Sequence, residues 1–186
     1  AWIVIKHPFC QHCPWRLPLT HYDWLELWNG PWEAATRNED TFHYWLQQLR
    51  EGKTIAVTAG SDFHKEKALT LPTLAVRSHG GERDDILQAI AGGRSYMQSH
   101  DDIRLTRFSS GEAEIGGTTT SPTLHIDLAV PDHHQVLLYT QRQVLELPHH
   151  NGRVQQDVRW ADSRFAFLRV NEGRCAQLIT NPIFRE

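Results

Sequence analysis

The sequence predicts an α/β fold, with the last part of a distorted parallel (β/α) barrel over residues 1–109 and a small antiparallel β-sandwich-like module over residues 110–186. Two observations predict this division. Before residue 110, apolar residues recur alternately at helix and strand spacing, as in βαβ units. From about Ile103 onward no helical pattern remains, and short apolar runs are separated by Gly, Pro and Asn turns, as in antiparallel sandwiches.

Two segments of the first region have the spacing of amphipathic helices. We expect one helix over Asn38–Gly52, with acidic residues in its first turn, and another over Glu82–Ala91, which Gly92-Gly93 ends. Their inward positions are Phe42, Trp45, Leu46 and Leu49 in the first helix, and Ile86, Leu87 and Ile90 in the second.

Short apolar runs predict the strands. In the first region they are Trp2–Lys6, Leu25–Trp28, Thr54–Thr58, Thr73–Arg77 and Arg94–Gln98. In the second they are Ile103–Phe108, Thr123–Val130, Gln135–Tyr139, Val144–Leu147, Val154–Trp160, Arg164–Val170 and Ala176–Thr180. Apolar residues alternate in the second group, so each strand buries one face and antiparallel pairing is expected.

The most informative motif is Gly60-Ser61-Asp62-Phe63-His64, which follows the apolar run Thr54–Val57. In parallel α/β folds, catalytic and metal-binding groups gather at the carboxyl ends of buried strands. Residues two apart in an extended segment point to the same side, so Asp62 and His64 could offer an oxygen and a nitrogen to one ion. A polar loop, with Asp62 capping a helix and His64 at the surface, explains these five residues equally well.

A second imidazole follows the first predicted strand, where His7 precedes Pro8 and is therefore expected to be extended. The order His-Pro, Leu25-Glu26-Leu27-Trp28-Asn29-Gly30, helix, strand and Gly-Ser-Asp-Phe-His resembles the C-terminal half of the PHP-domain metallohydrolases, most closely the CehA/McbA-type branch. Ile86–Ile90 with Gly92–Tyr96, and Thr180–Phe184, also resemble that branch. The resemblance covers nearly the whole chain.

The resemblance implies that His7, Asp62 and His64 are metal ligands and that Asp62 and His64 take part in catalysis. PHP domains bind two or three metal ions and begin with a His-x-His, which this sequence lacks. We therefore expect Ala1 to lie within a longer protein whose upstream segment carries the remaining ligands. Nitrogen and carboxylate ligands suit zinc, manganese or iron, so two or three such divalent ions are the expected cofactors.

Four further residues are candidates for binding substrate or orienting the ligands. Glu26 could accept a histidine N–H and Asn29 could orient a ligand, although ordinary capping at a strand end is an equal alternative. Arg16 and Lys65 could neutralise a substrate phosphate, although surface charge is the commoner role of such residues.

The expected reaction is hydrolysis by a metal-bound hydroxide. PHP enzymes mostly cleave phosphate esters, so the first expectation is a phosphoesterase that acts on a small-molecule ester. Aryl-ester or carbamate hydrolysis on the same site is an alternative, because the branch includes it. A non-catalytic binding or scaffolding protein with a degenerate PHP domain is a third hypothesis.

Charge and hydropathy restrict the partners. The formal net charge of -3 and scattered basic residues argue against a nucleic-acid polymer as partner. No apolar run approaches the roughly eighteen residues that span a bilayer, so a soluble chain without membrane contact is expected. The sequence defines no oligomeric state or compartment, and it is compatible with a periplasmic or secreted location because a signal peptide would precede Ala1.

Two other clusters have several explanations. Cys10, His12 and Cys13 could form half of a soft-metal site, a strained disulfide or an incidental loop, and the lack of a second Cys-x-x-Cys favours the loop. The pairs His133-His134 and His149-His150 lie in predicted turns, which favours solvated histidines over a second metal site.

Overall fold

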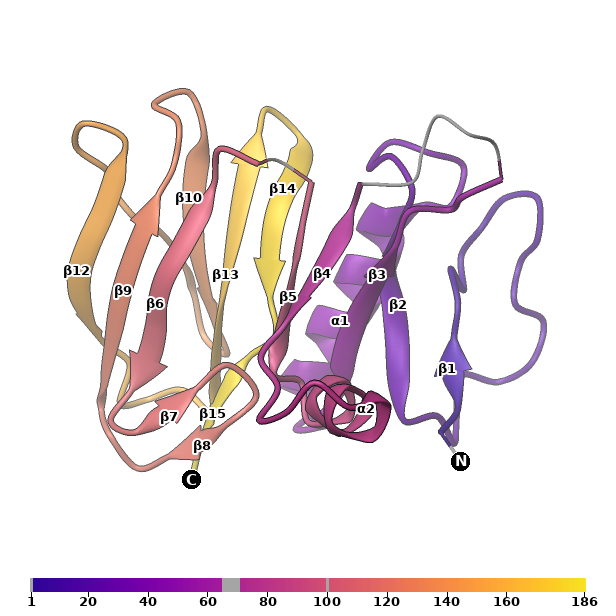
Figure 1. The fold of residues 1–186 in the computed structure, drawn as a ribbon, viewed down its shortest axis with the longest axis horizontal. Coiled ribbons are helices and arrows are strands. Elements are labelled where there is room, and N and C mark those ends of the chain that lie inside the picture. Colours follow the sequence, from indigo (N-terminus) through magenta and orange to yellow (C-terminus); the bar gives the residue numbers. More distant parts are fainter. Residues whose placement is uncertain (1, 65–70, 100) are drawn as a thin grey trace.

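The computed structural model describes residues 2–64, 71–99 and 101–186, which form three β-sheets and two helices (Figure 1). Sheet A is parallel and has the order β1-β2-β3. Its strands are β1 (Val4–Ile5), β2 (Trp24–Asn29) and β3 (Ala56–Gly60). Helix α1 (Asn38–Arg50) connects β2 to β3.

Sheets B and C contain the remaining strands. Sheet B comprises β4 (Thr73–Val76), β5 (Ser95–Gln98), β8 (Thr118–Thr119), β10 (Gln135–Thr140), β11 (Val144–Glu146), β13 (Phe165–Glu172), β14 (Cys175–Thr180) and β15 (Ile183–Arg185). Its order is β11-β10-β13-β14-β5-β4, with β15 pairing with both β13 and β8. Sheet C comprises β6 (Arg104–Ser110), β7 (Ala113–Glu114), β9 (Thr123–Ala129) and β12 (Arg153–Arg159), in the order β12-β9-β6-β7.

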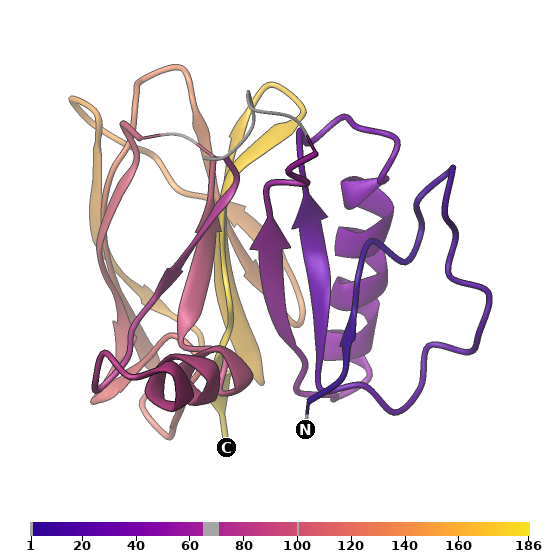
Figure 2. The same cartoon turned by 45° about the vertical axis from the view of Figure 1, so that its right-hand side comes forward.

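Helix α1 begins and ends close to its predicted limits. Its predicted inward residues Phe42, Trp45, Leu46 and Leu49 are all buried. Helix α2 (Arg83–Ala91) lies at the end of the molecule where both termini lie (Figure 2), and it buries little. Ile86, predicted to point inward, is 37% exposed, and of this helix only Ala89 is fully buried.

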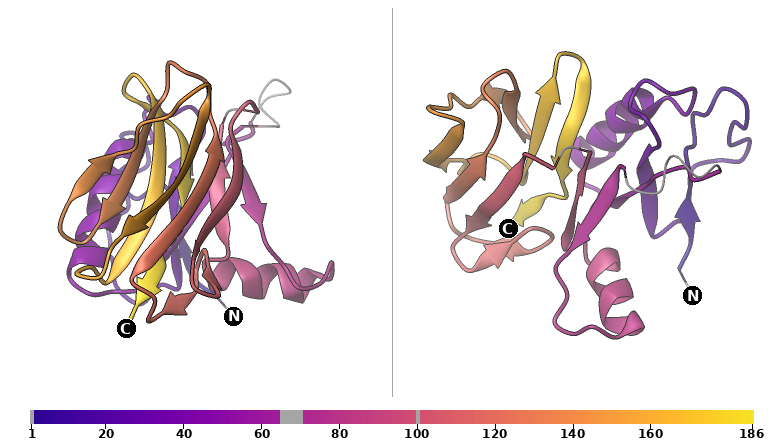
Figure 3. Two further views of the ribbon diagram at one scale, coloured as in Figure 1. Left: turned by 90° about the vertical axis from the view of Figure 1, so that its left-hand side faces the viewer. Right: turned by 45° about the horizontal axis from the view of Figure 1, so that its top comes forward.

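Strand β13 is the centre of the packing because its side chains alternate between two hydrophobic cores. Phe165 and Phe167 join α1 and sheet A in the first core. Ala166, Leu168 and Val170 join sheet C in the second. The strand is therefore buried on both faces, and the molecule has sheet B in its middle, sheet C on one side and sheet A with α1 on the other (Figure 3).

The prediction of an α/β fold ending a (β/α) PHP barrel is wrong. The structure is 41% strand and 12% helix, and the described strands form separate sheets that close no barrel. After β3 the chain does not continue the parallel order of sheet A, since β4 and β5 form an antiparallel pair and β5 pairs antiparallel with β14 near the other end of the sequence. These long-range antiparallel ladders override the local βαβ pattern.

Strands β4 and β5 thus share sheet B with strands that follow residue 110. The division of the chain into two domains at residue 110 stays a prediction. The strands expected after Ile103 are present, and β7, β8 and β15 are additional short strands that sequence periodicity did not indicate. Neither helix in the described part of the chain is long and apolar enough to cross a membrane.

Candidate functional site

The three parallel strands of sheet A bring the predicted motifs to one end of the molecule. His7 follows β1, Asn29 ends β2, and Asp62 follows β3. The chain beyond β2 stays close to β3, because the Gly30 N–H donates to the Gly60 carbonyl at 2.8 Å. We call the set His7, Glu26, Asn29, Asp62 and His64 the parallel edge. It forms because carboxyl ends of parallel strands meet at one edge of a sheet.

Asp62 and His64 are in contact at this edge. The His64 Nε2 lies 3.2 Å from Asp62 Oδ1, and both side chains are exposed to solvent. Asp62 has a left-handed backbone, with φ of 53°, which carboxylate and amide residues tolerate better than others. The predicted oxygen and nitrogen donors therefore lie together.

Glu26 is the buried carboxylate of the parallel edge, with 7% of its surface exposed. Loss of solvation raises its pKa above the ordinary 4.5, which means that burial penalises the charged form. The Asn29 Nδ2 donates to Glu26 Oε2 at 3.3 Å, and the His7 backbone N–H also donates to this carboxylate. Both hydrogen bonds lower the pKa of Glu26 and so oppose the effect of burial. Glu26 therefore fixes the chain that carries His7 and the amide of Asn29.

Two glycines let these groups approach one another. A Cβ at Gly60 would lie 2.8 Å from Glu26 Oε1, and a Cβ at Gly30 would lie 3.2 Å from the Asp62 Cβ. Gly30 also has a positive φ of 63°. The Asn29 Oδ1 is buried and has no hydrogen-bond partner among the described residues, so the edge contains an unsatisfied oxygen acceptor.

His7 does not lie with Asp62 and His64 in one close group. Its Nδ1 is 3.6 Å from Cys13 Sγ, and the ligand atoms of His7, Cys10 and Cys13 lie within 4.8 Å of one another. Among the described residues, no group of three ligand atoms within that distance contains Asp62 or His64. The shared set of three metal ligands stays a prediction.

Cys10 and Cys13 are joined by a disulfide, with their Cα atoms 5.3 Å apart. The Cys13 N–H donates to Cys10 Sγ at 3.2 Å. The interpretation of these cysteines as an incidental loop is therefore wrong, and the imidazole whose ligand atom groups with their sulfur atoms is that of His7.

The two cationic candidates add little to the parallel edge. Arg16 lies exposed in the loop between β1 and β2, and none of the hydrogen bonds or ion pairs described in the structure involves its side chain. Lys65 lies outside the described residues. Both stay predictions as substrate-binding residues.

A second group of ligand atoms lies at the end of the sandwich, where the sequence favoured solvated histidines over a second metal site. The ligand atoms of His133, His134 and Glu172 lie within 4.8 Å of one another. His134 is 3% exposed, so the prediction of solvated histidines is wrong for this residue. No signal in the sequence could join Glu172 to His133, because the pairing of β10 with β13 brings them together.

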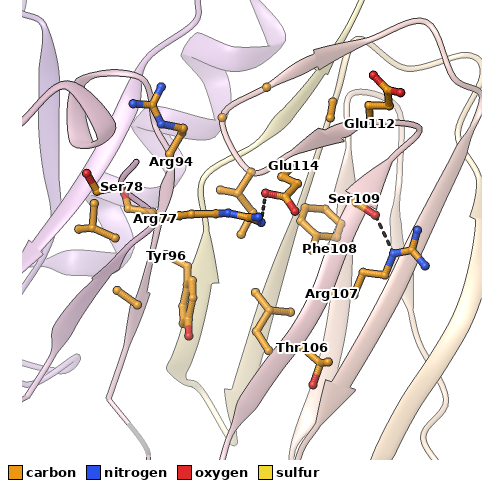
Figure 4. Close-up of a pocket in the computed structure, with 18 of the residues that line it drawn as sticks. Arg77, Ser78, Arg94, Tyr96, Thr106, Arg107, Phe108, Ser109, Glu112 and Glu114 are labelled. Carbon is orange, nitrogen blue, oxygen red and sulfur yellow. Dashed lines mark hydrogen bonds and ion pairs between the residues drawn. The ribbon is translucent and has the colours of Figure 1, made fainter. Parts of the chain in front are cut away.

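A groove of about 1300 Å³ opens between β4–β5 and the segment that carries β6, β7 and β8 (Figure 4). Arg77 forms an ion pair with Glu114, and Arg107 donates to the hydroxyl of Ser109 at 2.9 Å. The Arg94 Nε is buried and has no hydrogen-bond partner in the part of the chain that the structure describes. None of the predicted site residues that the structure describes lines this groove.

Comparisons with protein-family models, curated proteins and solved structures gave no match.

Proposed function

We propose that the parallel edge binds a divalent metal ion and hydrolyses small-molecule phosphate esters. The observation that carries the proposal is the contact between Asp62 Oδ1 and His64 Nε2 at the carboxyl end of a parallel strand. The order of the motifs, which resembles that of the PHP metallohydrolases, supports it. The proposal needs the parallel edge and does not need a closed barrel.

The residues of the edge fit a cation of the zinc, manganese or iron class. Asp62 and His64 offer the mixed oxygen and nitrogen donors that such ions prefer, and Asn29 Oδ1 is an unsatisfied acceptor at the end of the neighbouring strand. A divalent cation there would supply Lewis-acid activation of water and charge stabilisation at the ester. A centre with two or three ions needs more ligands than these, and we propose that they come from outside residues 1–186.

The remaining residues of the edge position the ligands. Glu26 holds the His7 backbone and the Asn29 amide, and its burial keeps that carboxylate from moving toward solvent. Gly30 and Gly60 keep the space that lets Asp62 and Glu26 pack against neighbouring strands. Arg16 and Lys65 stay proposals for neutralising a substrate phosphate. Aryl-ester or carbamate hydrolysis would use the same groups.

The test compares two Asp–His pairs within one protein. The protein, with any sequence that precedes Ala1 in its gene, is assayed for metal content and for hydrolysis of an aryl phosphate and an aryl ester with manganese or zinc. Asp62→Ala should lower the rate by about a hundredfold or more, since it removes about 3 kcal/mol of transition-state stabilisation. The matched control is Asp157→Ala, because Asp157 Oδ1 lies 2.7 Å from His125 Nδ1 in an equivalent pair on sheet C.

A second candidate function is ligand binding without catalysis, favoured by the groove that Arg77, Arg94 and Arg107 line. The buried, unpartnered Arg94 Nε suits an anionic ligand. If Asp62→Ala keeps full metal occupancy and full rate, the hydrolase assignment is overturned, and titration of inorganic phosphate into wild type and Arg94→Gln then tests the binding function.

A further inference from the structure

We propose that His133, His134 and Glu172 form a second metal site, the sandwich-end site, which takes a divalent first-row transition metal of the zinc class. The site is independent of the parallel edge, with which it shares no residue. Its three donors come from the turn between β9 and β10 and from the last residue of β13, and the β9–β10 and β13–β14 connections lie at the same end of the sandwich (Figure 1).

The donor spacing fits one ion. Donors held about 2.1 Å from a tetrahedral zinc ion lie about 3.4 Å from one another. The His133 Nε2 lies 3.4 Å from Glu172 Oε1, and the ligand atom of His134 completes a group within 4.8 Å. The two imidazole rings lie side by side, with centroids 4.3 Å apart, so small side-chain rotations can direct all three donors at one point.

The backbone already holds the donors in place. In the β10–β13 ladder the last register pair is Gln135 with Asn171, so His134 and Glu172 stand one step beyond it on the two strands. The His134 N–H donates to the Pro131 carbonyl at 3.0 Å and closes the turn. A site carried by a paired ladder pays little conformational entropy when it binds an ion.

A neighbouring histidine fixes the turn from outside the donor set. The His149 Nε2 lies 3.0 Å from the His134 carbonyl, and its Nδ1 lies 3.8 Å from Asp132 Oδ1. Such contacts behind the ligands orient them and strengthen metal binding.

The donor chemistry selects the class of ion. Two imidazole nitrogens and one carboxylate oxygen suit zinc and its first-row neighbours, whereas calcium and magnesium prefer oxygen ligands. A simple ion pair between His133 and Glu172 is the competing explanation. The pairs His125–Asp157 and His43–Glu39 are of that kind, because neither belongs to a three-donor group among the described residues.

The experiment first removes the two proposed metal ligands of the parallel edge, Asp62 and His64. In an Asp62→Asn, His64→Asn background, stripped of metal and with the Cys10–Cys13 disulfide kept oxidised, zinc chloride is titrated by calorimetry and magnesium chloride serves as the ion control. His133→Asn and Glu172→Gln are added singly. Their side chains are 62% and 50% exposed, so both variants should fold, which circular dichroism checks. His125→Asn is the matched control, since it removes a histidine from a plain ion pair.

The Asp62→Asn, His64→Asn background should bind one zinc ion and no magnesium. Adding His133→Asn or Glu172→Gln should weaken zinc binding at least tenfold. Adding His125→Asn should leave zinc binding unchanged. The sandwich-end site is overturned if the background binds no zinc, if both cluster variants bind as tightly as the background, or if His125→Asn weakens binding equally. Loss of activity in the background bears only on the parallel edge, so the two proposals fail separately.

Discussion

The two layers on either side of sheet B bury different kinds of side chain. The layer toward α1 and sheet A, called the helix-side layer, is rich in aromatic residues. They include Trp28, Trp32, Phe42, Trp45, Phe165 and Phe167. The layer between sheets B and C, called the sandwich layer, is mostly aliphatic. Its members include Leu124, Ile126, Leu128, Val136, Leu138, Val154, Leu168, Val170 and Leu178.

Charge separates the layers further. Of the Asp, Glu, Lys and Arg side chains in the described residues, those that are buried are Glu26 and Arg169, and both lie on the side of sheet B that carries α1 and sheet A. Burying a charge costs free energy unless specific partners compensate, so such groups are expected where structure serves function. Among the described residues, the sandwich layer buries no such charge.

The largest expected effects come from truncating neighbouring residues of β13 that point into opposite layers. Phe167→Ala should destabilise the protein by about 4 kcal/mol and Leu168→Ala by about 3 kcal/mol, because both side chains are fully buried and each truncation leaves a cavity. Phe167 also loses ring contacts with Trp45 and Tyr139. Urea unfolding measures both. A loss below about 1 kcal/mol for Phe167→Ala would show that the aromatic layer repacks freely.

Arg169 tests whether buried charge joins β13 to α1. Its guanidinium donates to both oxygens of Glu39, at 2.9 and 2.8 Å, and lies over the ring of Phe42 at 4.4 Å. Arg169→Ala should cost about 2 kcal/mol, which is less than breaking a fully buried ion pair usually costs, because Glu39 can be hydrated. Arg169→Met should recover part of this loss by restoring the packing. Equal losses for the two variants would mean that the charge, rather than the packing, carries the whole effect.

Substitution of Glu26 should change the free energy of unfolding least, and it should stabilise the protein rather than destabilise it. Its folded-state pKa is raised, so at pH values between the unfolded and the folded pKa the folded protein binds more protons than the unfolded chain. Stability is therefore greatest below the unfolded value near 4.5 and falls as the pH rises through the folded pKa. Glu26→Gln should raise the free energy of unfolding by about 1 kcal/mol at pH 8 and change little at pH 4.

Urea unfolding at both pH values checks the Glu26 prediction, and the activity assay separates stability from function. A positioning role predicts a more stable protein with weaker metal binding. If the Gln variant is less stable at pH 8, the two hydrogen bonds to Glu26 outweigh its desolvation.

Sequence reasoning worked where the determinants were local. Helix α1 followed from the spacing of Phe42, Trp45 and Leu49, and Asp62 and His64 came together because they lie only two positions apart in the sequence. The sequence favoured a loop over a disulfide for Cys10 and Cys13, which are disulfide-bonded. It also predicted that Ile86 points inward, whereas Ile86 is exposed. Whether a helix face meets a partner depends on elements that its own sequence does not describe.

The amino-acid sequence by itself determined helix α1, the Asp62–His64 pair and the described strands other than β7, β8 and β15, because periodicity of 2 or 3.6 residues and short spacing act within a few residues of chain. Tertiary structure alone decided that β5 pairs with β14, that β13 faces two cores, and that Glu172 meets His133. Each of these results depends on which distant strands pair, and similar apolar patterns allow several pairings. The pairing that forms is the one in which the sheets together bury the most favourable surface, and no single segment encodes that surface.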